Sequence, residues 1–311
     1  MRKTCLRMVY ELAKREPRVV FVGSDLGAGT LAEFRDEMPD RFFMEGIAEQ
    51  NLIGVAAGLA MEGYIPYVNT IATFLTRRCY EQIAVDVCMH DLPVRLIGNG
   101  GGLVYAPLGP THLAVEDLSI MRALPGMTVV APADKDEMVR LMAGTTRRRG
   151  PMYIRLAKGG DPVVSHEEAG FEVGRAILMR PPGRFLMIAT GVMTGRALTA
   201  AKALAKRGVA CGVLHVHTLK PLDGEAILDL AGRVEGVVTI EENTLMGGLG
   251  SAVAELLAER SSGRAPALVR LGIPDAFPDK YGSQDDLLAH FGLDPNAIAA
   301  TVEGLAGRLA A

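Results

Sequence analysis

Short apolar runs alternate with longer amphipathic stretches along the first half of the chain. Each run is apolar on both faces and is bounded by Gly, Pro or Asp, which is the pattern of a strand buried in a parallel sheet. The predicted strands cover residues 18–22, 41–44, 65–69, 94–98, 128–131 and 152–156. The predicted helices cover residues 2–15, 48–62, 76–91, 114–124 and 135–149, and Asp134 is placed to cap the last of them. The alternation predicts a doubly wound α/β domain.

The alternation stops at residues 158–162, which read Lys-Gly-Gly-Asp-Pro, and restarts after about Gly170. Further strands are predicted at residues 185–190, 209–216, 236–241 and 267–271, with helices at 194–207, 224–232 and 248–261. This pattern predicts a second, smaller α/β domain. We therefore expect one domain over residues 1–160, a linker over 161–172 and a second domain over 173–311.

Composition narrows the class of protein. A chain of 311 residues and 33.1 kDa fits two domains, and 49% hydrophobic against 22% charged residues excludes disorder as the main state. A net charge of −3 does not fit a nucleic-acid binder, and the longest uncharged apolar stretches reach about half a membrane span. The first residues show no apolar signal segment and the four cysteines form no CxxC pair. We expect a cytoplasmic protein without a zinc site or disulfides.

Residues 43–51 join the end of a predicted strand to the start of a helix, and they place Glu49 in the first helical turn. The following residues 52–60 are apolar on all sides and include Gly54 and Gly58, which predicts a buried helix that another helix can approach closely. Glu49 would then lie at the edge of a buried surface, where a carboxylate needs a partner. Either it supports the helix N-terminus, or it is a buried acid that hydrogen-bonds a ligand.

Two further segments carry candidate chemistry. Phe74, Arg77 and Tyr80 are spaced i, i+3, i+6, so one helix face would present either two core aromatics and a solvated charge or a platform for a flat heterocycle. Residues 98–112 are rich in glycine, follow a strand end and finish at His112, which is where ligand loops of α/β folds lie. His112 is then either a surface histidine or a substrate-facing one.

Two weaker signals lie in the second half. The glycine-rich residues 247–251 open a helix after a strand and could cradle a phosphate, although tight packing explains them equally well. His215 and His217 share one face of a strand, but a metal site would need further ligands.

Taken in order, these segments resemble the C-terminal portion of transketolases, and more specifically the separate small subunit of split transketolases. The matching part of deoxyxylulose-phosphate synthases is also similar. The resemblance runs from about Thr4 to Leu309. Its anchors are Gly23-Ser24-Asp25-Leu26, Gly46-Ile47-Ala48-Glu49-Gln50-Asn51, Thr73-Phe74-Leu75, Gly109-Pro110-Thr111-His112, Tyr153-Ile154-Arg155, His217-Thr218-Leu219-Lys220-Pro221-Leu222-Asp223 and Glu241-Glu242-Asn243 with Gly247-Gly248-Leu249-Gly250-Ser251.

The resemblance implies thiamine diphosphate as cofactor, bound by a pyrimidine-binding domain that precedes a transketolase C-terminal domain. Glu49 matches the glutamate that hydrogen-bonds the aminopyrimidine ring nitrogen and so helps to activate the thiazolium C2. Phe74 matches the residue that stacks on the pyrimidine. The other residues that match positions near the cofactor are Arg77, Tyr80, Asp25 and Leu26.

The resemblance also implies a substrate side. His112 matches a histidine that contacts the sugar hydroxyls, and Arg155 matches an arginine that holds a substrate phosphate, for which its fork geometry is suited. Leu108 departs from the family because it stands where transketolases carry an aspartate that reads sugar stereochemistry. Gly29, Gly100 and Gly101 stand near positions of polar phosphate-pocket residues. The departures predict an unusual sugar as donor or acceptor.

One family motif is missing. The diphosphate and Mg²⁺ are bound by a Gly-Asp-Gly followed by an Asn, and here the one Gly-Asp, at Gly160-Asp161, is followed by Pro162. The resemblance therefore implies a partner chain that carries the diphosphate half and the Mg²⁺ ligands, in an α₂β₂ assembly that transfers ketol units between sugars.

The alternatives are a subunit similar to a deoxyxylulose-phosphate synthase or to the β subunit of a 2-oxoacid dehydrogenase, and a regulatory subunit without catalysis. The retained Glu49, Phe74 and His112 argue against the regulatory one.

Overall fold

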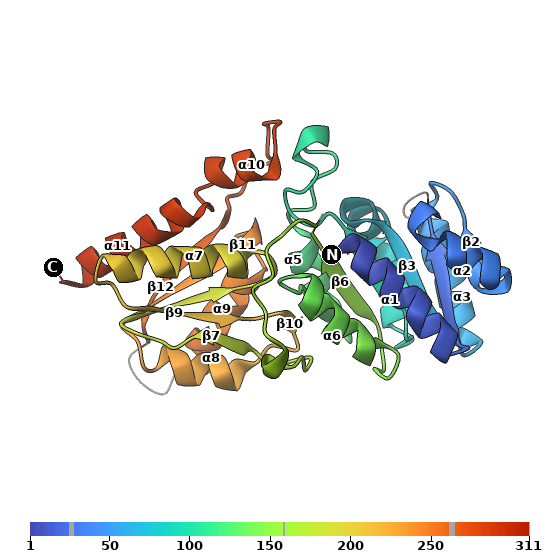
Figure 1. The fold of residues 1–311 in the computed structure, drawn as a ribbon, viewed down its shortest axis with the longest axis horizontal. Helices are drawn as coiled ribbons and strands as arrows, with labels where there is room; N and C mark the ends of the chain where they lie inside the picture. Colours follow the sequence, from blue (N-terminus) through green and yellow to red (C-terminus); the bar gives the residue numbers. More distant parts are fainter. Residues whose placement is uncertain (25–27, 158, 261–264, 311) are drawn as a thin grey trace.

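The computed structural model describes residues 1–24, 28–157, 159–260 and 265–310. Two α/β units lie side by side in it, and residues after β6 cross between them (Figure 1). A seven-stranded sheet has the order β10-β5-β6-β4-β3-β1-β2, and a five-stranded sheet has the order β12-β11-β8-β9-β7. The two sheets and their helices confirm the two doubly wound α/β units that the sequence predicts.

Most strands lie within a residue or two of the predicted ranges. The strands of the first sheet are β1 (Val19–Gly23), β2 (Phe42–Met44), β3 (Ile65–Ile71), β4 (Arg95–Asn99), β5 (Thr128–Val130), β6 (Met152–Leu156) and β10 (Thr218–Lys220). Those of the second sheet are β7 (Ile177–Arg180), β8 (Phe185–Ala189), β9 (Cys211–His215), β11 (Gly236–Thr244) and β12 (Ala267–Ile273). Every residue of β1, β4, β6, β8 and β9 is buried, which explains why most of their residues are apolar.

The helices cover both faces of each sheet. The α-helices are α1 (Arg2–Arg15), α2 (Ala32–Glu37), α3 (Glu49–Met61), α4 (Tyr80–Gln82), α5 (Asp117–Ala123), α6 (Lys135–Thr145), α7 (Met193–Lys206), α8 (Gly224–Ala231), α9 (Leu249–Arg260), α10 (Gln284–His290) and α11 (Pro295–Ala310). Two π-helices, η3 (Phe74–Arg78) and η4 (Ile83–Cys88), flank α4. Short 3₁₀ turns are η1 (Ala28–Leu31), η2 (Pro39–Arg41), η5 (Ala106–Leu108) and η6 (Glu167–Ala169).

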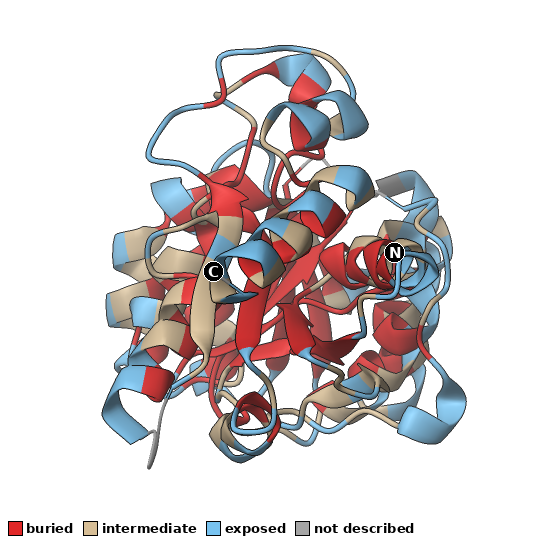
Figure 2. Cartoon of the chain, turned by 90° about the vertical axis from the view of Figure 1, so that its left-hand side faces the viewer, coloured by how far each residue is buried: buried red, intermediate tan, exposed pale blue. Residues whose placement is uncertain are grey.

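Three buried clusters hold the layers together. One packs α1 and α6 against the first sheet, and another packs α7 and α11 against the second. The third is continuous between the units and joins α3 and η4 of the first to α8 and α9 of the second. Figure 2 shows the resulting pattern of buried strands between helices with exposed outer faces. The continuous cluster means that the two units share one apolar core.

The second unit also contributes strand β10 to the first sheet, and this strand was not predicted from the sequence. Strand β10 pairs antiparallel with β5, so that Thr218 lies opposite Val130. The linker is fastened as well, because the Asp134 carboxylate accepts hydrogen bonds from the backbone N–H groups of Val164 and Ser165 at 2.8 and 2.7 Å. The same carboxylate caps α6, as predicted, by accepting from the N–H of Glu137.

Other elements differ from prediction. The single helix expected over residues 76–91 is a π–α–π series, and the second unit contains β7, α10 and α11 in addition to the predicted elements. Strand β7 is a half-exposed edge strand, so it lacks the buried apolar run that marks the central strands. None of the helices within the described ranges combines the length and apolar character that a membrane-spanning helix requires.

Candidate functional site at the carboxyl edge of the first sheet

Three predicted segments follow the carboxyl ends of parallel strands of the first sheet. The connection after β2 leads into α3 at Glu49, β3 leads into η3 at Phe74, and β4 leads into the glycine-rich loop that ends at His112. Because parallel strands all end at the same edge of a sheet, the fold itself brings these three segments together.

Glu49 is the buried acid of this edge. It stands in the first turn of α3 and only 2% of it is exposed. Its Oε2 accepts a hydrogen bond from Nη1 of Arg78 at 2.5 Å, within an ion pair whose arginine side chain is 45% exposed. The N-terminus of α3 and the Arg78 guanidinium thus both lie against this acidic side chain.

Arg78 and the aromatic rings extend this contact into a cluster. The Arg78 Cζ lies 4.7 Å from the centroid of the Phe74 ring, and the edge of the His112 ring meets Phe74 with 5.1 Å between ring centroids. Glu49, Phe74, Arg78 and His112 therefore form a continuous series of contacts, which we call the acid–aromatic cluster. Phe74 and His112 are both partly exposed, so the cluster reaches the surface.

The sequence reasoning missed Arg78 and favoured Arg77 because it assumed α-helical spacing. The segment is a π-helix, whose i→i+5 hydrogen bonds make each turn wider. On an α-helix the residues at i+3 and i+4 both neighbour Phe74, whereas in the wider π turn only the residue at i+4 stays on its face. Nothing in an isolated sequence marks this register change, although π-helices occur often at functional sites.

Arg77 and Tyr80 make their described contacts with another part of the chain. Nε and Nη2 of Arg77 both donate to the Glu116 carboxylate, with 2.9 Å between Nη2 and Oε2, and Nη2 also donates to the Leu113 carbonyl. The Tyr80 hydroxyl donates to the Ile120 carbonyl at 3.2 Å. These contacts fix η3 and α4 against α5, and a role of either residue toward a cofactor stays a prediction.

The loop that carries His112 is held by the second unit. Gly102 has a φ of +68°, and a Cβ there would lie 2.4 Å from Cδ of Glu242, so only glycine fits. The Glu242 carboxylate accepts from the N–H of Leu103 at 2.8 Å, and burial raises the pKa of this carboxyl. Further along, Leu108 is 50% exposed in η5. Glu242 of the C-terminal unit thus holds this loop in place.

A second contact from the C-terminal unit reaches the outer part of this loop. The segment before α10 and the loop around η5 rise side by side (Figure 1). Tyr281 is 68% exposed, and its ring would lie 2.6 Å from a Cβ on Gly109. Residues of both units therefore surround the approach to His112.

Arg155 lies beneath the loop instead of at its surface. It is 8% exposed, its Nε lies 3.1 Å from Oδ2 of Asp117, and its Nη2 donates to the carbonyls of Ala114 and Glu242 at 3.1 and 2.7 Å. The Tyr153 hydroxyl donates to the same Oδ2 at 2.6 Å. The structure does not bring Arg155 to the exposed side of the acid–aromatic cluster, and its phosphate-binding role stays a prediction. Asp25 and Leu26 lie outside the described residues.

The glycine-rich start of α9 is occupied by a side chain of the chain itself. The Glu241 carboxylate accepts from the N–H groups of Leu249 and Gly250 at 2.8 and 2.7 Å, and burial raises its pKa to about 7. A Cβ on Gly248 would lie 2.0 Å from Oε2 of Glu241. Close packing thus explains these glycines, and no phosphate is needed to do so.

The strand histidines are packed in the interior as well. His215 Nε2 lies 2.9 Å from Oε2 of Glu137, and the His217 ring stacks on Phe171 with 4.0 Å between centroids. Among the described residues no group of three His, Cys, Asp or Glu side chains could hold a metal ion. Both histidines therefore serve the contact between the two units.

Lowering the pH is expected to reduce the free energy of unfolding, because the buried His217 is harder to protonate in the folded chain than in the unfolded one. Burial, and next the neighbouring His215, lowers its pKa to about 4, whereas an unfolded histidine titrates near pH 6.5. Between those two values the unfolded chain binds a proton that the folded chain does not, so the free energy of unfolding falls as the pH falls, by about 3 kcal/mol in total. Urea unfolding at about pH 7 and about pH 4.5 should show a smaller loss for His217→Gln than for the parent. Equal losses would contradict this origin.

The outer face of α3 differs from prediction, because the helix is not buried on all sides in the single chain. Gly54 and Gly58 are exposed, and a Cβ on either would meet nothing within 4 Å. Exposed apolar side chains lie nearby, with Ile47 72%, Met61 57% and Met89 73% exposed. The exposed face of α3 beside Glu49 thus combines glycines and Met61 with polar residues, and it is open to contact with another chain.

Comparison with known proteins gives a consistent result. The family description "Transketolase, pyrimidine binding domain" matches residues 1–160, and "Transketolase, C-terminal domain" matches residues 174–298. The 6-deoxy-6-sulfo-D-fructose transketolase subunit SqwH of Clostridium sp. (strain MSTE9) is 38% identical over 96% of this chain and 92% of its own length. 1-Deoxy-D-xylulose-5-phosphate synthase 1 of Geobacter sulfurreducens (strain ATCC 51573 / DSM 12127 / PCA) is 40% identical, but the match spans only 46% of that protein.

Solved structures agree on the fold. One described as "Split gene transketolase, inactive beta4 tetramer" has a TM-score of 0.89 at 37% identity, covering 98% of this chain and 97% of that chain. The transketolase of Campylobacter jejuni subsp. jejuni NCTC 11168 has a TM-score of 0.78 at 20% identity over 97% of this chain and 46% of its own, which shows the shared fold.

Proposed function

Because this chain belongs to the transketolase family, we propose that it is the small subunit of a two-chain, thiamine-diphosphate-dependent transferase that moves a ketol unit between sugars. The observation that carries the proposal is Glu49, a buried acid at the head of α3 whose partner Arg78 lies over the Phe74 ring. A carboxyl group beside an aromatic ring is what an aminopyrimidine requires for orientation and proton transfer.

The cluster around Glu49 fits such a ring. The Arg78 guanidinium is flat, carries N–H groups, bonds the Glu49 carboxylate at 2.5 Å and lies over Phe74 at 4.7 Å. A flat, nitrogen-bearing group is therefore accommodated between the acid and the aromatic face. Arg78 is 45% exposed, so it has room to turn toward solvent when another flat group takes that place.

Each residue of the acid–aromatic cluster would have a separate role. When bound, thiamine diphosphate supplies a thiazolium carbon that becomes a nucleophile after losing its C2 proton. Glu49 would hold a proton at the pyrimidine nitrogen, and Phe74 would fix the plane of the ring. His112, whose ring touches Phe74, would bond hydroxyl groups of the sugar.

A partner chain is part of the proposal. This chain lacks the Gly-Asp-Gly motif, so the diphosphate and Mg²⁺ would be held by a second chain that carries it. The exposed face of α3 beside Glu49, where Gly54 and Gly58 leave the helix open to close approach, supports a subunit interface at the site. The similar split-gene transketolase is described as an inactive β4 tetramer, which supports inactivity of this type of chain alone. We propose an α₂β₂ assembly.

A cytoplasmic location completes the proposal. All four cysteines, Cys5, Cys79, Cys88 and Cys211, are buried and free, which suits a reducing compartment.

Transferase activity is expected only when both chains are present. We would express this chain with a chain that carries Gly-Asp-Gly and Asn, and follow ketol transfer from ketose phosphates and from 6-deoxy-6-sulfofructose to aldose phosphates. Either chain alone should be inactive and the mixture active with Mg²⁺ and thiamine diphosphate. An active single chain, or an assembled complex that is inactive with every donor, would contradict the proposal.

Activity with pyruvate would distinguish a second candidate function, that of a deoxyxylulose-phosphate synthase subunit. The 40% identity to 1-deoxy-D-xylulose-5-phosphate synthase 1 allows a subunit that condenses pyruvate with an aldose phosphate. The same assembled complex should release little CO₂ from pyruvate if the ketol-transferring function is correct. Rapid CO₂ release with no ketol transfer would favour the synthase.

Leu108 is expected to weaken discrimination at one sugar hydroxyl. It is 50% exposed on the loop that ends at His112, and a leucine cannot accept a hydrogen bond. A site that hydrogen-bonds a hydroxyl discriminates far more strongly than an apolar one. In the assembled complex, Leu108→Asp should therefore sharpen the preference between donors epimeric at that hydroxyl by roughly tenfold or more. If the parent already discriminates as sharply as the variant, Leu108 does not set the specificity.

A further inference from the structure

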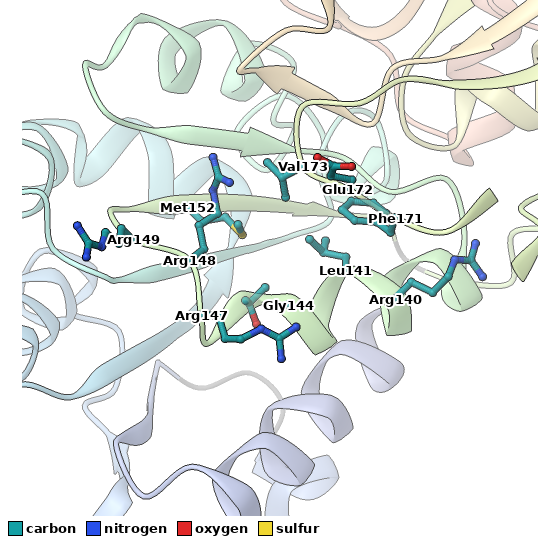
Figure 3. A pocket seen from close by; sticks show the side chains of 11 residues that line it. Arg140, Leu141, Gly144, Arg147, Arg148, Arg149, Met152, Phe171, Glu172 and Val173 are labelled. Atoms are coloured by element: carbon teal, nitrogen blue, oxygen red, sulfur yellow. The ribbon is translucent and has the colours of Figure 1, made fainter. Parts of the chain in front are cut away.

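We propose that a second site, independent of the proposed function, binds a small organic phosphate of nucleotide size at the opposite edge of the first sheet. The site is a hollow of about 570 Å³ lined by Arg140, Arg147, Arg148 and Arg149, here called the arginine hollow (Figure 3). It lies between α6, the turn that precedes β6 and residues 171–173 of the linker. Because that turn leads into the amino end of β6, the hollow is remote from the acid–aromatic cluster.

The arginines of the hollow lack carboxylate partners. Several exposed arginines elsewhere in the described ranges are paired, as in Arg207 with Glu303 at 2.9 Å and Arg184 with Glu235 at 2.8 Å. Glu172 is the one carboxylate on the lining, and no ion pair within 4.0 Å joins it to a lining arginine in the described part of the chain. Four like charges gathered in one hollow repel one another unless an anion is bound.

Two buried nitrogen atoms of Arg140 have no hydrogen-bond acceptor among the described residues. Its Nε and Nη2 are buried, and neither has a hydrogen-bond partner within the described ranges. Nearly all buried polar groups of folded proteins are satisfied, and leaving a guanidinium nitrogen unsatisfied is costly. Phosphate oxygens match the donor geometry of guanidinium groups and would satisfy these nitrogens.

The turn that carries the other three arginines is held rigidly. Arg95 is fully buried and donates to the carbonyls of Thr145, Arg148 and Gly150. Those carbonyls are therefore engaged already, and Arg95 brings a further positive charge beneath the turn. Burial lowers the pKa of Arg95 to about 10 and also lowers that of Arg148.

The lining also indicates what the rest of the ligand is like. Figure 3 places Arg140 at one end of the hollow and Arg149 at the other, with Leu141 and Phe171 between them. The Phe171 ring is fixed by stacking on His217. A volume of 570 Å³ is in the range of small-molecule sites, about 300–1,000 Å³. The arrangement fits a ligand that joins an apolar ring to several anionic oxygens, and a lone phosphate would leave part of the wall bare.

Calorimetric titration of the full chain with ATP, pyrophosphate and adenosine, each without Mg²⁺, tests the proposal. ATP should bind saturably, pyrophosphate more weakly and adenosine not measurably. Arg147→Gln and Arg140→Gln should each weaken ATP binding by roughly tenfold or more, since each removes a charged hydrogen-bond donor. Arg175→Gln, on an exposed arginine of the same linker region, and Glu49→Gln, at the other site, should leave it unchanged.

A second measurement guards against misfolded variants. Arg147 is exposed, so its replacement should leave the unfolding transition unchanged even if that of Arg140 does not. Hydrogen exchange of residues 145–150 and 171–173 should slow when ATP binds to the parent. Absence of saturable ATP binding, or binding that survives Arg147→Gln and Arg140→Gln, would overturn the proposal. So would binding that Glu49→Gln abolishes, because the phosphate would then occupy the acid–aromatic cluster.

Discussion

Replacing Glu49 with glutamine is expected to slow loss of the C2 proton of bound thiamine diphosphate by about 10²–10⁴-fold in the assembled enzyme. The amide cannot share a proton with the ring nitrogen as a carboxyl group can. Its oxygen can still accept the hydrogen bond that Arg78 donates to Glu49, so the fold should persist. The loss therefore reports chemistry and not unfolding.

Exchange of the C2 proton for deuterium, followed by quenching and NMR, measures this step without any sugar. Glu45→Gln is the matched control, because Glu45 is an exposed glutamate of the same connection. The control should exchange at the parent rate. An exchange rate for Glu49→Gln within twofold of the parent would show that Glu49 is structural.

Replacing Asp117 with asparagine is expected to cost about 3–5 kcal/mol of unfolding free energy. Asp117 is fully buried, pairs with Arg155 at 3.1 Å and accepts from the Tyr153 hydroxyl at 2.6 Å. The variant leaves the Arg155 guanidinium, which is 8% exposed, without its counter-charge. Because Arg155 also holds the carbonyls of Ala114 and Glu242, the loop of His112 and its contact with the second unit should loosen together.

Urea unfolding of the two adjacent variants separates a buried pair from an exposed one. Glu116→Gln removes the acid that pairs with Arg77, whose side chains are 26% and 33% exposed, and should cost about 1 kcal/mol or less. Comparable losses for Glu116→Gln and Asp117→Asn would contradict a special role of the buried pair.

The central strands could be predicted because each is buried on both faces and is bounded by turn residues. Strand β4 and strand β6 match their predicted ranges to within one residue for that reason. Strand β10 could not be predicted, since its three residues carry no periodicity and its partner β5 lies far away in the sequence. Strand β7 could not be predicted either, because it is half-exposed and therefore lacks a buried apolar run.

The candidate site divides in a similar way. Glu49, Phe74 and His112 could be found because each follows the end of a strand, and the topology of the sheet brings such positions together. Arg78 could not be distinguished from Arg77, because both would neighbour Phe74 on an α-helix and only the π-helix leaves Arg78 alone on that face. Arg155 shows the opposite case, in which a matched motif lies beneath the surface, held by Asp117, instead of open to a ligand.

The proposed function requires that this chain hold one half of a cofactor site. Calorimetric titration with thiamine diphosphate and Mg²⁺ tests it directly, first on this chain alone and then on its complex with the Gly-Asp-Gly partner. We expect no saturable binding by the chain alone, and tight, Mg²⁺-dependent binding by the complex with one cofactor for each pair of chains. Tight, Mg²⁺-dependent binding by this chain alone would contradict the account.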